Sequence, residues 1–495
     1  MNNLLKTFLL MCIAITGLVL LQLMPEMSLF GCKLRKVDLL SDIRCDSLLQ
    51  KQNITINSQP VVVAAKKTNP DSLAKIRQSI KRDSTLAIED FSNIGELHCS
   101  IDSFYQKLLD SKKLSRPVRI AYFGDSFIES DILTKDLRQY LQANFGGHGV
   151  GFVDVAHPLA DIRSTVKSNS SNFRAHVATD KRGFCKDLSG VDLIYAVPTD
   201  TSAQFSLSAV KTVKDSNNYF NYSAVYYLTR PEVKFSAFAN GKPITKMDAV
   251  KEKYVSMLAF TSPMKSVTWK MHFNSTNDTT SNFNLSDCAV FGASCESTKG
   301  VILDNFSLRG HSGLLFRRVP SSTMHDFLKL RHYDLVILGY GLNVASENRT
   351  NYNAYGAQLK KVVRRIAEVS PHTSILIVGV GDRARRTGAG IVTRPEILYL
   401  NQLQRKTAQS LGCAFWDLYN AMKKHGGIKG MTESKPPLAN KDYTHINSAG
   451  GKKIARDLYN DIIKGLIDYK RRVKEFKKLL AEQNINDTTF AQLQQ

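Results

Sequence analysis

The sequence lacks the signatures of metal centres and of nucleic-acid modules, and these absences narrow its possible functions. Its 8 cysteines and 11 histidines show none of the spacings that hold a zinc ion. It has neither a long basic run nor an aromatic-plus-basic RNA-binding pattern. No segment recurs at a period of roughly 20–50 residues, which excludes a solenoid or a propeller. We therefore predict a chain with no metal, no cofactor and no nucleic-acid partner.

Acidic residues are scarce relative to basic ones. Lysine and arginine number 67 against 44 aspartates and glutamates, so the formal net charge is +23. An excess of this size indicates anionic surroundings, and charge alone does not choose among nucleic acid, a membrane face and an acidic glycan. The length of 495 residues and the 43% hydrophobic content allow two or three ordinary globular domains.

One long apolar run occurs, and it lies near the N-terminus. Residues 7–24 carry no charge and have the length of a short membrane span, which needs about 17–25 apolar residues. No small-x-small cleavage site follows. We expect residues 1–32 to form an uncleaved inner-membrane anchor with the rest of the chain in the periplasm; a cleaved signal and a buried helix are the alternatives. Lys33, Arg35 and Lys36 follow the run and count against this orientation.

Two cysteines lie close together in the sequence. Cys288 and Cys295 flank a Phe-Gly pair seven residues apart. They could form a hairpin disulfide in an oxidising compartment, or they could be two buried free thiols. The sequence leaves both readings open.

The order of apolar patterns predicts an α/β domain interrupted by a β-rich insertion. Strands at 118–123, 301–306, 334–338, 374–379 and 414–418 alternate with helical segments, which is typical of a parallel sheet covered on both faces. Between them, short alternating strands such as 233–238 and 267–273 indicate a β-sandwich or jelly roll. The predicted parts are an anchor (1–32), a polar stalk (33–95), the α/β domain (96–160 and 296–467), the inserted module (161–295) and a C-terminal helical tail (468–495) whose apolar face packs or lies on a membrane.

A candidate nucleophile ends the first strong strand, in Gly124-Asp125-Ser126. A serine hydroxyl needs an adjacent base, and the base needs a third group that fixes its tautomer. Ser126 would start the following helix, where its unpaired N–H could donate to an oxyanion. Taken alone, Asp-Ser before a helix is at least as typical of a helix N-cap.

The candidate base and its partner lie far along the chain, in Asp442-Tyr443-Thr444-His445. An aspartate and a histidine three residues apart on one turn can share a hydrogen bond and face a common cleft. Taken alone, the pattern also fits an ordinary polar loop.

Two further loops supply candidate oxyanion donors at strand ends. Asn343 closes the strand that ends in Gly-Tyr-Gly and could present its side-chain amide. Gly313 follows the strand at 301–306 and offers an uncrowded backbone N–H. A turn residue and a plain strand-to-helix turn are the structural alternatives.

Taken in order, these four blocks resemble the SGNH (GDSL-type) hydrolase superfamily over residues 96–165 and 296–465. The resemblance implies a flavodoxin-like three-layer α/β/α domain with Ser126 as nucleophile and Asp442 and His445 as its activating pair. It also implies an oxyanion hole formed by Ser126, Gly313 and Asn343. The sequence departs from the family in lacking an acidic residue after Asn343 and an asparagine two residues before Gly310.

The inserted module resembles the arrangement in envelope O-acetyl esterases and acetyltransferases of this superfamily. We therefore expect a serine esterase acting on acyl, and specifically O-acetyl, esters of an envelope or peptidoglycan-like carbohydrate. One alternative is an O-acetyltransferase that works with a membrane-bound O-acyltransferase partner. A non-catalytic glycan-binding protein is another.

Overall fold

The structure is a computed structural model that describes residues 28–29, 32–33, 79–157, 162–180, 183–210, 219–229, 233–273, 287–388 and 390–482. The expected anchor at 7–24 and most of the expected stalk lie outside these residues. Strands β1 (Ser28–Leu29) and β2 (Cys32–Lys33) pair as a small antiparallel hairpin. In the described part of the chain, no helix is long and apolar enough to cross a bilayer.

The sheet of the α/β domain has six strands in the order β17-β4-β18-β19-β22-β3. The first five are parallel to one another, and β3 pairs antiparallel with β22 at one edge. Their bounds are β3 Ile88–Asp90, β4 Val118–Gly124, β17 Val301–Ser307, β18 Leu335–Gly339, β19 Ser374–Val378 and β22 Ala414–Trp416. Continuous apolar runs such as that of β19, which is buried at every position, are what a sheet covered on both faces requires.

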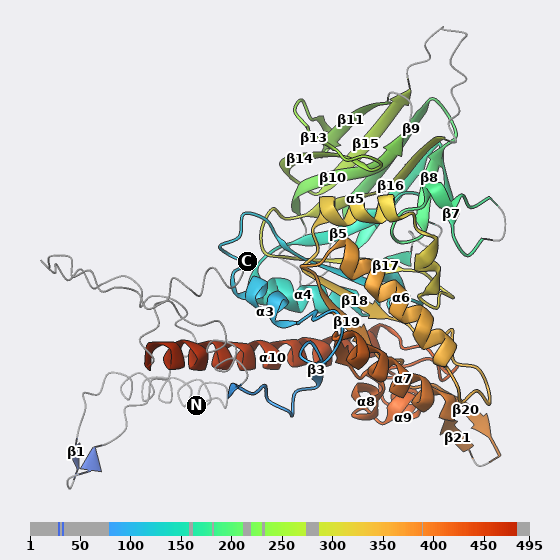
Figure 1. Cartoon of the computed structure of the whole chain (residues 1–495). Coiled ribbons are helices and arrows are strands. Elements are labelled where there is room, and N and C mark those ends of the chain that lie inside the picture. The colour runs from blue at the N-terminus through green and yellow to red at the C-terminus, as the bar shows by residue number, and fades with distance from the viewer. Residues whose placement is uncertain are drawn as a thin grey trace, which may run out of the picture. The chain divides into compact units, whose positions relative to one another are not determined.

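Helices pack against this sheet in two groups (Figure 1). One group contains α3 (Asp102–Leu109), α4 (Thr134–Phe145) and α10 (Ser448–Glu482), and α10 packs on both of the others. The other group contains α5 (Ser321–Arg331), α6 (Asn353–Val369) and α7 (Pro395–Leu411). Two short helices, α8 (Leu418–Lys423) and α9 (Gly427–Glu433), precede α10. The predicted three-layer α/β class is confirmed.

The C-terminal helix is longer than the sequence pattern indicated. The predicted tail boundary at residue 468 falls inside α10, which runs unbroken to Glu482. Phe476 and Leu480 are buried near its end and form a small apolar cluster with Ile80. The apolar face of this helix therefore packs within the protein as far as residue 482.

The insertion forms two antiparallel sheets with a core of their own, as expected for a β-sandwich. The first sheet has the order β13-β14-β10-β16-β8-β7, with β5 also paired to β16; the second has the order β12-β11-β15-β9-β6. The first comprises β5 Gly149–Asp154, β7 Phe173–Val177, β8 Ile194–Pro198, β10 Phe220–Thr229, β13 Asp248–Lys251, β14 Ser256–Met264 and β16 Cys288–Glu296. The second comprises β6 Val166–Ser171, β9 Ser202–Ala209, β11 Val233–Ala239, β12 Lys242–Pro243 and β15 Ser266–Phe273. The exact domain limits stay a prediction.

Strand β16 joins the two cores because both of its faces are buried. Val290 and Ala293 pack in the sandwich core, whereas Ala289 and Phe291 pack in the core of the α/β domain. A register shift opposite Tyr226 and Tyr227 changes which positions face the sandwich, as a β-bulge does.

The two cysteines of β16 are both buried, and neither is in a disulfide. Seven residues along one strand separate Cys288 from Cys295 by about 23 Å at ~3.3 Å per residue. A disulfide needs Cα atoms within about 7 Å, so the hairpin disulfide reading is wrong. The free-thiol reading holds.

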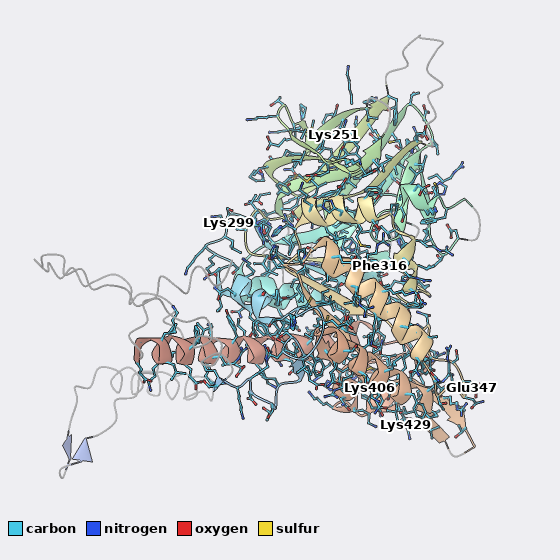
Figure 2. The ribbon with its side chains drawn as sticks, viewed as in Figure 1. Lys251, Lys299, Phe316, Glu347, Lys406 and Lys429 are labelled. Atoms are coloured by element: carbon cyan, nitrogen blue, oxygen red, sulfur yellow. The ribbon has the colours of Figure 1, made fainter. Side chains whose placement is uncertain are left out.

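Basic side chains are spread over both parts of the molecule (Figure 2). Lys251 projects from the sandwich, whereas Lys406 and Lys429 lie on α7 and α9, and all three are exposed. These lysines therefore mark no single basic patch.

Candidate active site

Ser126 lies just beyond the carboxyl end of β4, close to the centre of the parallel sheet. A Cβ at Gly124 would come within 2.9 Å of the Ile128 side chain, which would have to shift to make room for it. The Asp125 carboxylate accepts a hydrogen bond from the Phe127 N–H at 3.0 Å and fixes the turn. The expectation that Ser126 starts a helix is wrong, because α4 begins only at Thr134, after the short 3₁₀ turn Glu129–Asp131. Ser126 is thus not the N-cap of that helix.

The structure brings Ser126, His445 and Asp442 into one hydrogen-bonded chain. His445 Nε2 lies 3.1 Å from Ser126 Oγ, and His445 Nδ1 lies 2.7 Å from Asp442 Oδ2. The other Asp442 oxygen accepts the N–H groups of Thr444 at 2.9 Å and His445 at 3.0 Å. With Nδ1–H held by the carboxylate, Nε2 is left to accept the serine proton.

The electrostatics of this chain favour an ionised aspartate. Partial burial would raise the pKa of Asp442, but the hydrogen bonds from the His445 ring and from the His445 and Thr444 N–H groups lower it below its usual value. Asp442 therefore stays charged at neutral pH and can stabilise an imidazolium on His445.

Asn343 follows β18 on a turn in which the Val344 and Ala345 N–H groups donate to the Gly341 carbonyl. Its amide nitrogen lies 3.1 Å from the His311 carbonyl oxygen and 3.4 Å from Asp125 Oδ2. The exposed side chain is thus tethered beside the residue that precedes Ser126. The longer contact is weak and leaves one N–H able to turn to another acceptor.

Gly313 is held by its own loop. Its N–H donates to His311 Nδ1 at 3.3 Å, and a Cβ there would come within 2.8 Å of the Tyr340 ring. The hydrogen bond directs the Gly313 N–H toward His311. His311 is buried, and this burial lowers its pKa to about 4. The structure gives Gly313 a packing role and does not bring its N–H to Ser126.

Gly310 is a candidate donor that the sequence reasoning missed. It is exposed, it has a φ of +74°, and nothing lies within 4 Å of the position a Cβ would take. The Leu308 N–H donates to the Gly124 carbonyl, which brings this loop alongside Asp125 and Ser126. Among the described residues, neither the Ser126 N–H nor the Gly310 N–H has an acceptor. Gly310 lies closer in sequence to the end of β17 at Ser307 than Gly313 does. That position could have identified Gly310 as the candidate donor from the sequence alone.

Asp125 is the most perturbed acid of the site. It is 1% exposed, and burial raises its pKa to about 6 against the opposing hydrogen bond from Phe127. A carboxyl at this position couples the nucleophile turn to Asn343, a link that no sequence pattern indicated.

Asp382 and Arg383 follow β19 and do not form an ion pair with each other. Asp382 accepts hydrogen bonds from Thr393 Oγ1 at 3.0 Å and from the Ile428 N–H at 2.8 Å. The Arg383 side chain is half-buried. Burial and the positive charge of Arg394 lower its pKa, and the negative charge of Asp442 opposes this effect. The described residues hold no group of three or more histidines, cysteines or acids that could bind a metal.

Comparison with known proteins agrees with this geometry. Residues 277–453 match the GDSL-like Lipase/Acylhydrolase family. Over these residues the α/β domain is similar to that family. The matched range includes Asn343, Asp442 and His445 but begins after Ser126, so the position of Ser126 comes from the structure and not from this match. No curated protein sequence matches the chain.

One solved structure supports the fold of the α/β domain together with its insertion. A peptidoglycan O-acetylesterase superposes with a TM-score of 0.61 at 20% identity, over 77% of this chain and 99% of that one. An acetyl xylan esterase matches at 17% identity with a TM-score of 0.26, over 32% of this chain and 80% of its own. A family two carbohydrate esterase from Cellvibrio japonicus matches at 10% identity with a TM-score of 0.25, over 61% and 99%. The first match shows that one known fold spans both parts of the described molecule.

Proposed function

We propose that this chain is a serine esterase that removes O-acetyl groups from a cell-envelope glycan. The observation that carries the proposal is the hydrogen-bonded chain from Ser126 through His445 to Asp442 at the carboxyl edge of the parallel sheet. Ester hydrolysis through an acyl-serine uses this combination of nucleophile, base and orienting carboxylate. An O-acetylesterase of peptidoglycan with the same overall fold supports the choice of acyl group and polymer.

The first half of the reaction forms an acetyl-serine. His445 Nε2 takes the proton of the Ser126 hydroxyl while Oγ attacks the carbonyl carbon of the ester. The carbonyl oxygen becomes an oxyanion, and His445 then returns its proton to the sugar oxygen as the carbon–oxygen bond breaks. The sugar leaves with a free hydroxyl, and the acetyl group stays on Ser126.

The second half regenerates the enzyme. His445 takes a proton from a water molecule, whose oxygen attacks the acetyl carbonyl carbon. When the second tetrahedral intermediate collapses, Ser126 Oγ recovers the proton from His445 and acetate departs. Asp442 holds the imidazolium in position in both halves.

The oxyanion is held by the Ser126 N–H, the Gly310 N–H and the Asn343 side-chain amide in this proposal. Gly310 takes the place assigned to Gly313 from the sequence, because its N–H is unoccupied and its loop lies beside the nucleophile turn. Preorganised donors of this kind are worth about 10²–10³ in turnover each.

The decisive experiment compares the full chain with its Ser126→Ala variant on O-acetylated peptidoglycan and on p-nitrophenyl acetate, with and without an oligosaccharide acceptor. We expect the unmodified chain to release acetate from both substrates and the variant to release none. Acetate release from the small ester alone would refute the glycan substrate. Acetylation of the acceptor, with little acetate released, would assign transfer in place of hydrolysis.

A further inference from the structure

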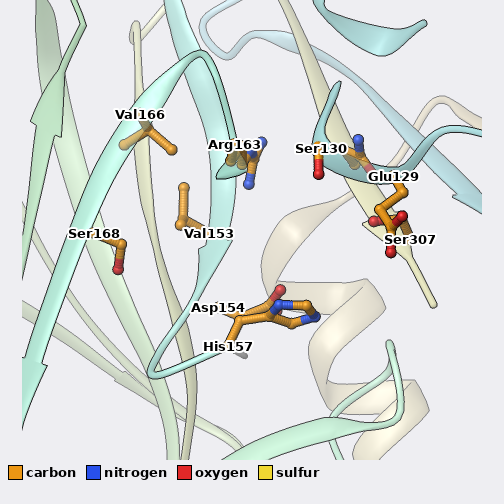
Figure 3. Close-up of a pocket in the computed structure, with 10 residues that line it drawn as sticks. Glu129, Ser130, Val153, Asp154, His157, Arg163, Val166, Ser168 and Ser307 are labelled. Atoms are coloured by element: carbon orange, nitrogen blue, oxygen red, sulfur yellow. The ribbon is translucent and has the colours of Figure 1, made fainter. Parts of the chain in front are cut away.

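A small polar pocket lies where the sandwich meets the α/β domain (Figure 3). Its volume is about 30 Å³. A water-sized group needs ~10–15 Å³ on this measure, so the pocket accepts about two hydroxyl-sized groups and not a whole sugar ring. Its polar lining comes from Glu129, Ser130 and Asn305 of the α/β domain and from Asp154, Arg163 and Ser168 of the sandwich side.

One buried carboxylate fixes the walls of this pocket. Asp131 accepts hydrogen bonds from Thr134 Oγ1 at 2.7 Å, Asn305 Nδ2 at 2.9 Å and Arg163 Nε at 2.9 Å. Ser130 and Asp131 have φ values of +54° and +64°, which non-glycine residues rarely adopt and which cost about 1–3 kcal/mol each. The surrounding hydrogen bonds therefore hold residues 130 and 131 in a backbone conformation that is unfavourable in isolation.

Three polar atoms of the lining are shielded from solvent and have no hydrogen-bond partner among the described residues: Ser130 Oγ, Arg163 Nη2 and Asn305 Oδ1. The Asp154 carboxyl shares a hydrogen bond with the carboxyl of Asp192, whose pKa is raised by burial and by Asp154. Asn305 is only 6% exposed, and its nitrogen already donates to the Ile128 carbonyl, Asp131 and Thr134, so its oxygen must point away from them. A buried polar group without a partner costs about 1–3 kcal/mol. Several such atoms in one pocket mark a polar site that water molecules, or the hydroxyl groups of a ligand that displaces them, would fill.

The chemistry of these atoms selects the ligand. The Ser130 hydroxyl and the Arg163 guanidinium donate, while the Asn305 amide oxygen and the Asp154 carboxylate accept. Sugar hydroxyls both donate and accept, so they match such a mixed set. Asp131 pairs with both Arg163, at 2.9 Å, and Arg138, at 3.2 Å. Asp154 supplies a second negative charge near Arg163, so the two arginines are balanced by two carboxylates and Asp154 would repel an anion. A neutral, hydroxyl-rich group therefore fits better than a phosphate or a carboxylate.

The pocket is close to the nucleophile. Glu129 follows Ser126 by three residues, so their Cα atoms lie at most about 11 Å apart. That separation is of the order of one or two sugar units. We propose that the pocket is a subsite for hydroxyl groups of the sugar residue next to the one that carries the ester, which rests on the proposed glycan esterase function.

Blocking the pocket tests this subsite. Ser168 lines the pocket from β6, whereas its neighbour Asn169 points to the opposite face of the same strand and is exposed. We expect Ser168→Phe to lower the ratio of kcat/KM for an O-acetylated oligosaccharide to kcat/KM for p-nitrophenyl acetate at least about tenfold, through KM. The control Asn169→Phe should leave both values as they are.

Removing a single donor gives a smaller effect of the same kind. Ser130→Gly deletes the hydroxyl and tolerates the positive φ, so the fold is kept. The loss of one hydrogen bond predicts a rise of roughly 2- to 13-fold in KM for the oligosaccharide. If Ser168→Phe changes the two substrates equally, or neither, the subsite is refuted while the esterase assignment stands.

A binding measurement separates the subsite from the proposed function. Unacetylated oligosaccharide is titrated calorimetrically into the full chain carrying Ser126→Ala, with and without Ser168→Phe. If the enzyme fails to deacetylate any glycan but binding is lost with Ser168→Phe, the subsite holds and the substrate assignment fails. Binding that is absent, or unchanged by Ser168→Phe, overturns the subsite.

Discussion

Two clusters of charged side chains in this molecule stand at opposite extremes of burial. The Asp442–His445 pair is open to water, with side chains 48% and 38% exposed. The pair of Arg331 with Asp304, at 2.5 Å, is completely buried where α5 and β17 meet the sandwich. The first cluster must exchange protons with a substrate, so it has to be reachable. The second has no such need.

The buried cluster ties the sandwich to the α/β domain. Arg331 also contacts Glu296 of β16 at 3.0 Å and donates to the Tyr226 hydroxyl of β10 at 3.2 Å. Arg119 of β4 donates to Glu296 at 2.6 Å. Each charge is partnered across the junction, so the network depends on all of its members. The charges of the Asp442–His445 pair therefore serve the chemical reaction. The charges of the Arg331 cluster hold the sandwich and the α/β domain in a fixed arrangement.

The largest expected effect separates activity from stability at the open cluster. Ser126→Ala removes the nucleophile and should lower kcat on an acetyl ester by about 10⁴- to 10⁶-fold. Because Ser126 Oγ makes a single, partly buried hydrogen bond, the melting temperature should change by no more than about 1 °C. Steady-state kinetics and differential scanning fluorimetry measure the two quantities. Substantial activity in this variant would remove Ser126 from the mechanism.

The buried cluster should show the reverse pattern. Arg331→Met leaves Asp304 and Glu296 buried without their partner and should cost about 3–5 kcal/mol of folding free energy. Protein that remains folded should keep its esterase activity. The matched control is Arg364→Met, which breaks an exposed pair with Glu96 and should cost no more than about 1 kcal/mol. Equal losses in denaturant melts of the two variants would contradict the comparison.

Asn343→Ala tests the donor at the edge of the open cluster. The loss of one preorganised amide should lower kcat by about 10²–10³, with a smaller change in KM. The Asn343 residue is exposed and its hydrogen bond to the His311 carbonyl is only partly buried, so stability should change little. An effect confined to KM would show that Asn343 binds substrate without stabilising the transition state.

Asp125 lies between the two extremes, since it is buried but belongs to the catalytic turn. Its folded pKa of about 6 exceeds the ordinary value near 3.8, so its stabilising contribution is present below about pH 4 and lost as pH rises through 6. Asp125→Asn should therefore gain stability relative to the unmodified chain between about pH 4 and 6, by up to about 3 kcal/mol, and hold that gain above pH 6. Melting temperatures across this range measure it. Parallel curves would show that Asp125 does not titrate there.

Local pattern predicted the strands of both sheets because burial imposes simple periods. The continuous apolar runs of β4, β18 and β19 fit a covered parallel sheet, and the alternating residues of β11 and β15 fit a sandwich. The same reasoning failed after Ser126, where two residues with positive φ delay α4 until Thr134. Hydrogen bonds from distant residues hold that segment, and no local pattern encodes them.

The sequence by itself determined the fold class and the candidate residues Ser126, Asn343, Asp442 and His445, because strand ends and block order are local properties of the chain. Only the tertiary structure decided which of them meet. In the structure, His445 Nε2 lies 3.1 Å from Ser126 Oγ. The Gly313 N–H donates to His311, whereas the Gly310 N–H has no acceptor among the described residues. The unpaired polar atoms of the pocket between the sandwich and the α/β domain also come together only in the folded chain. Distances between side chains far apart in sequence depend on the packing of whole sheets. The physical reason is that packing and buried hydrogen bonds are satisfied over the whole molecule at once.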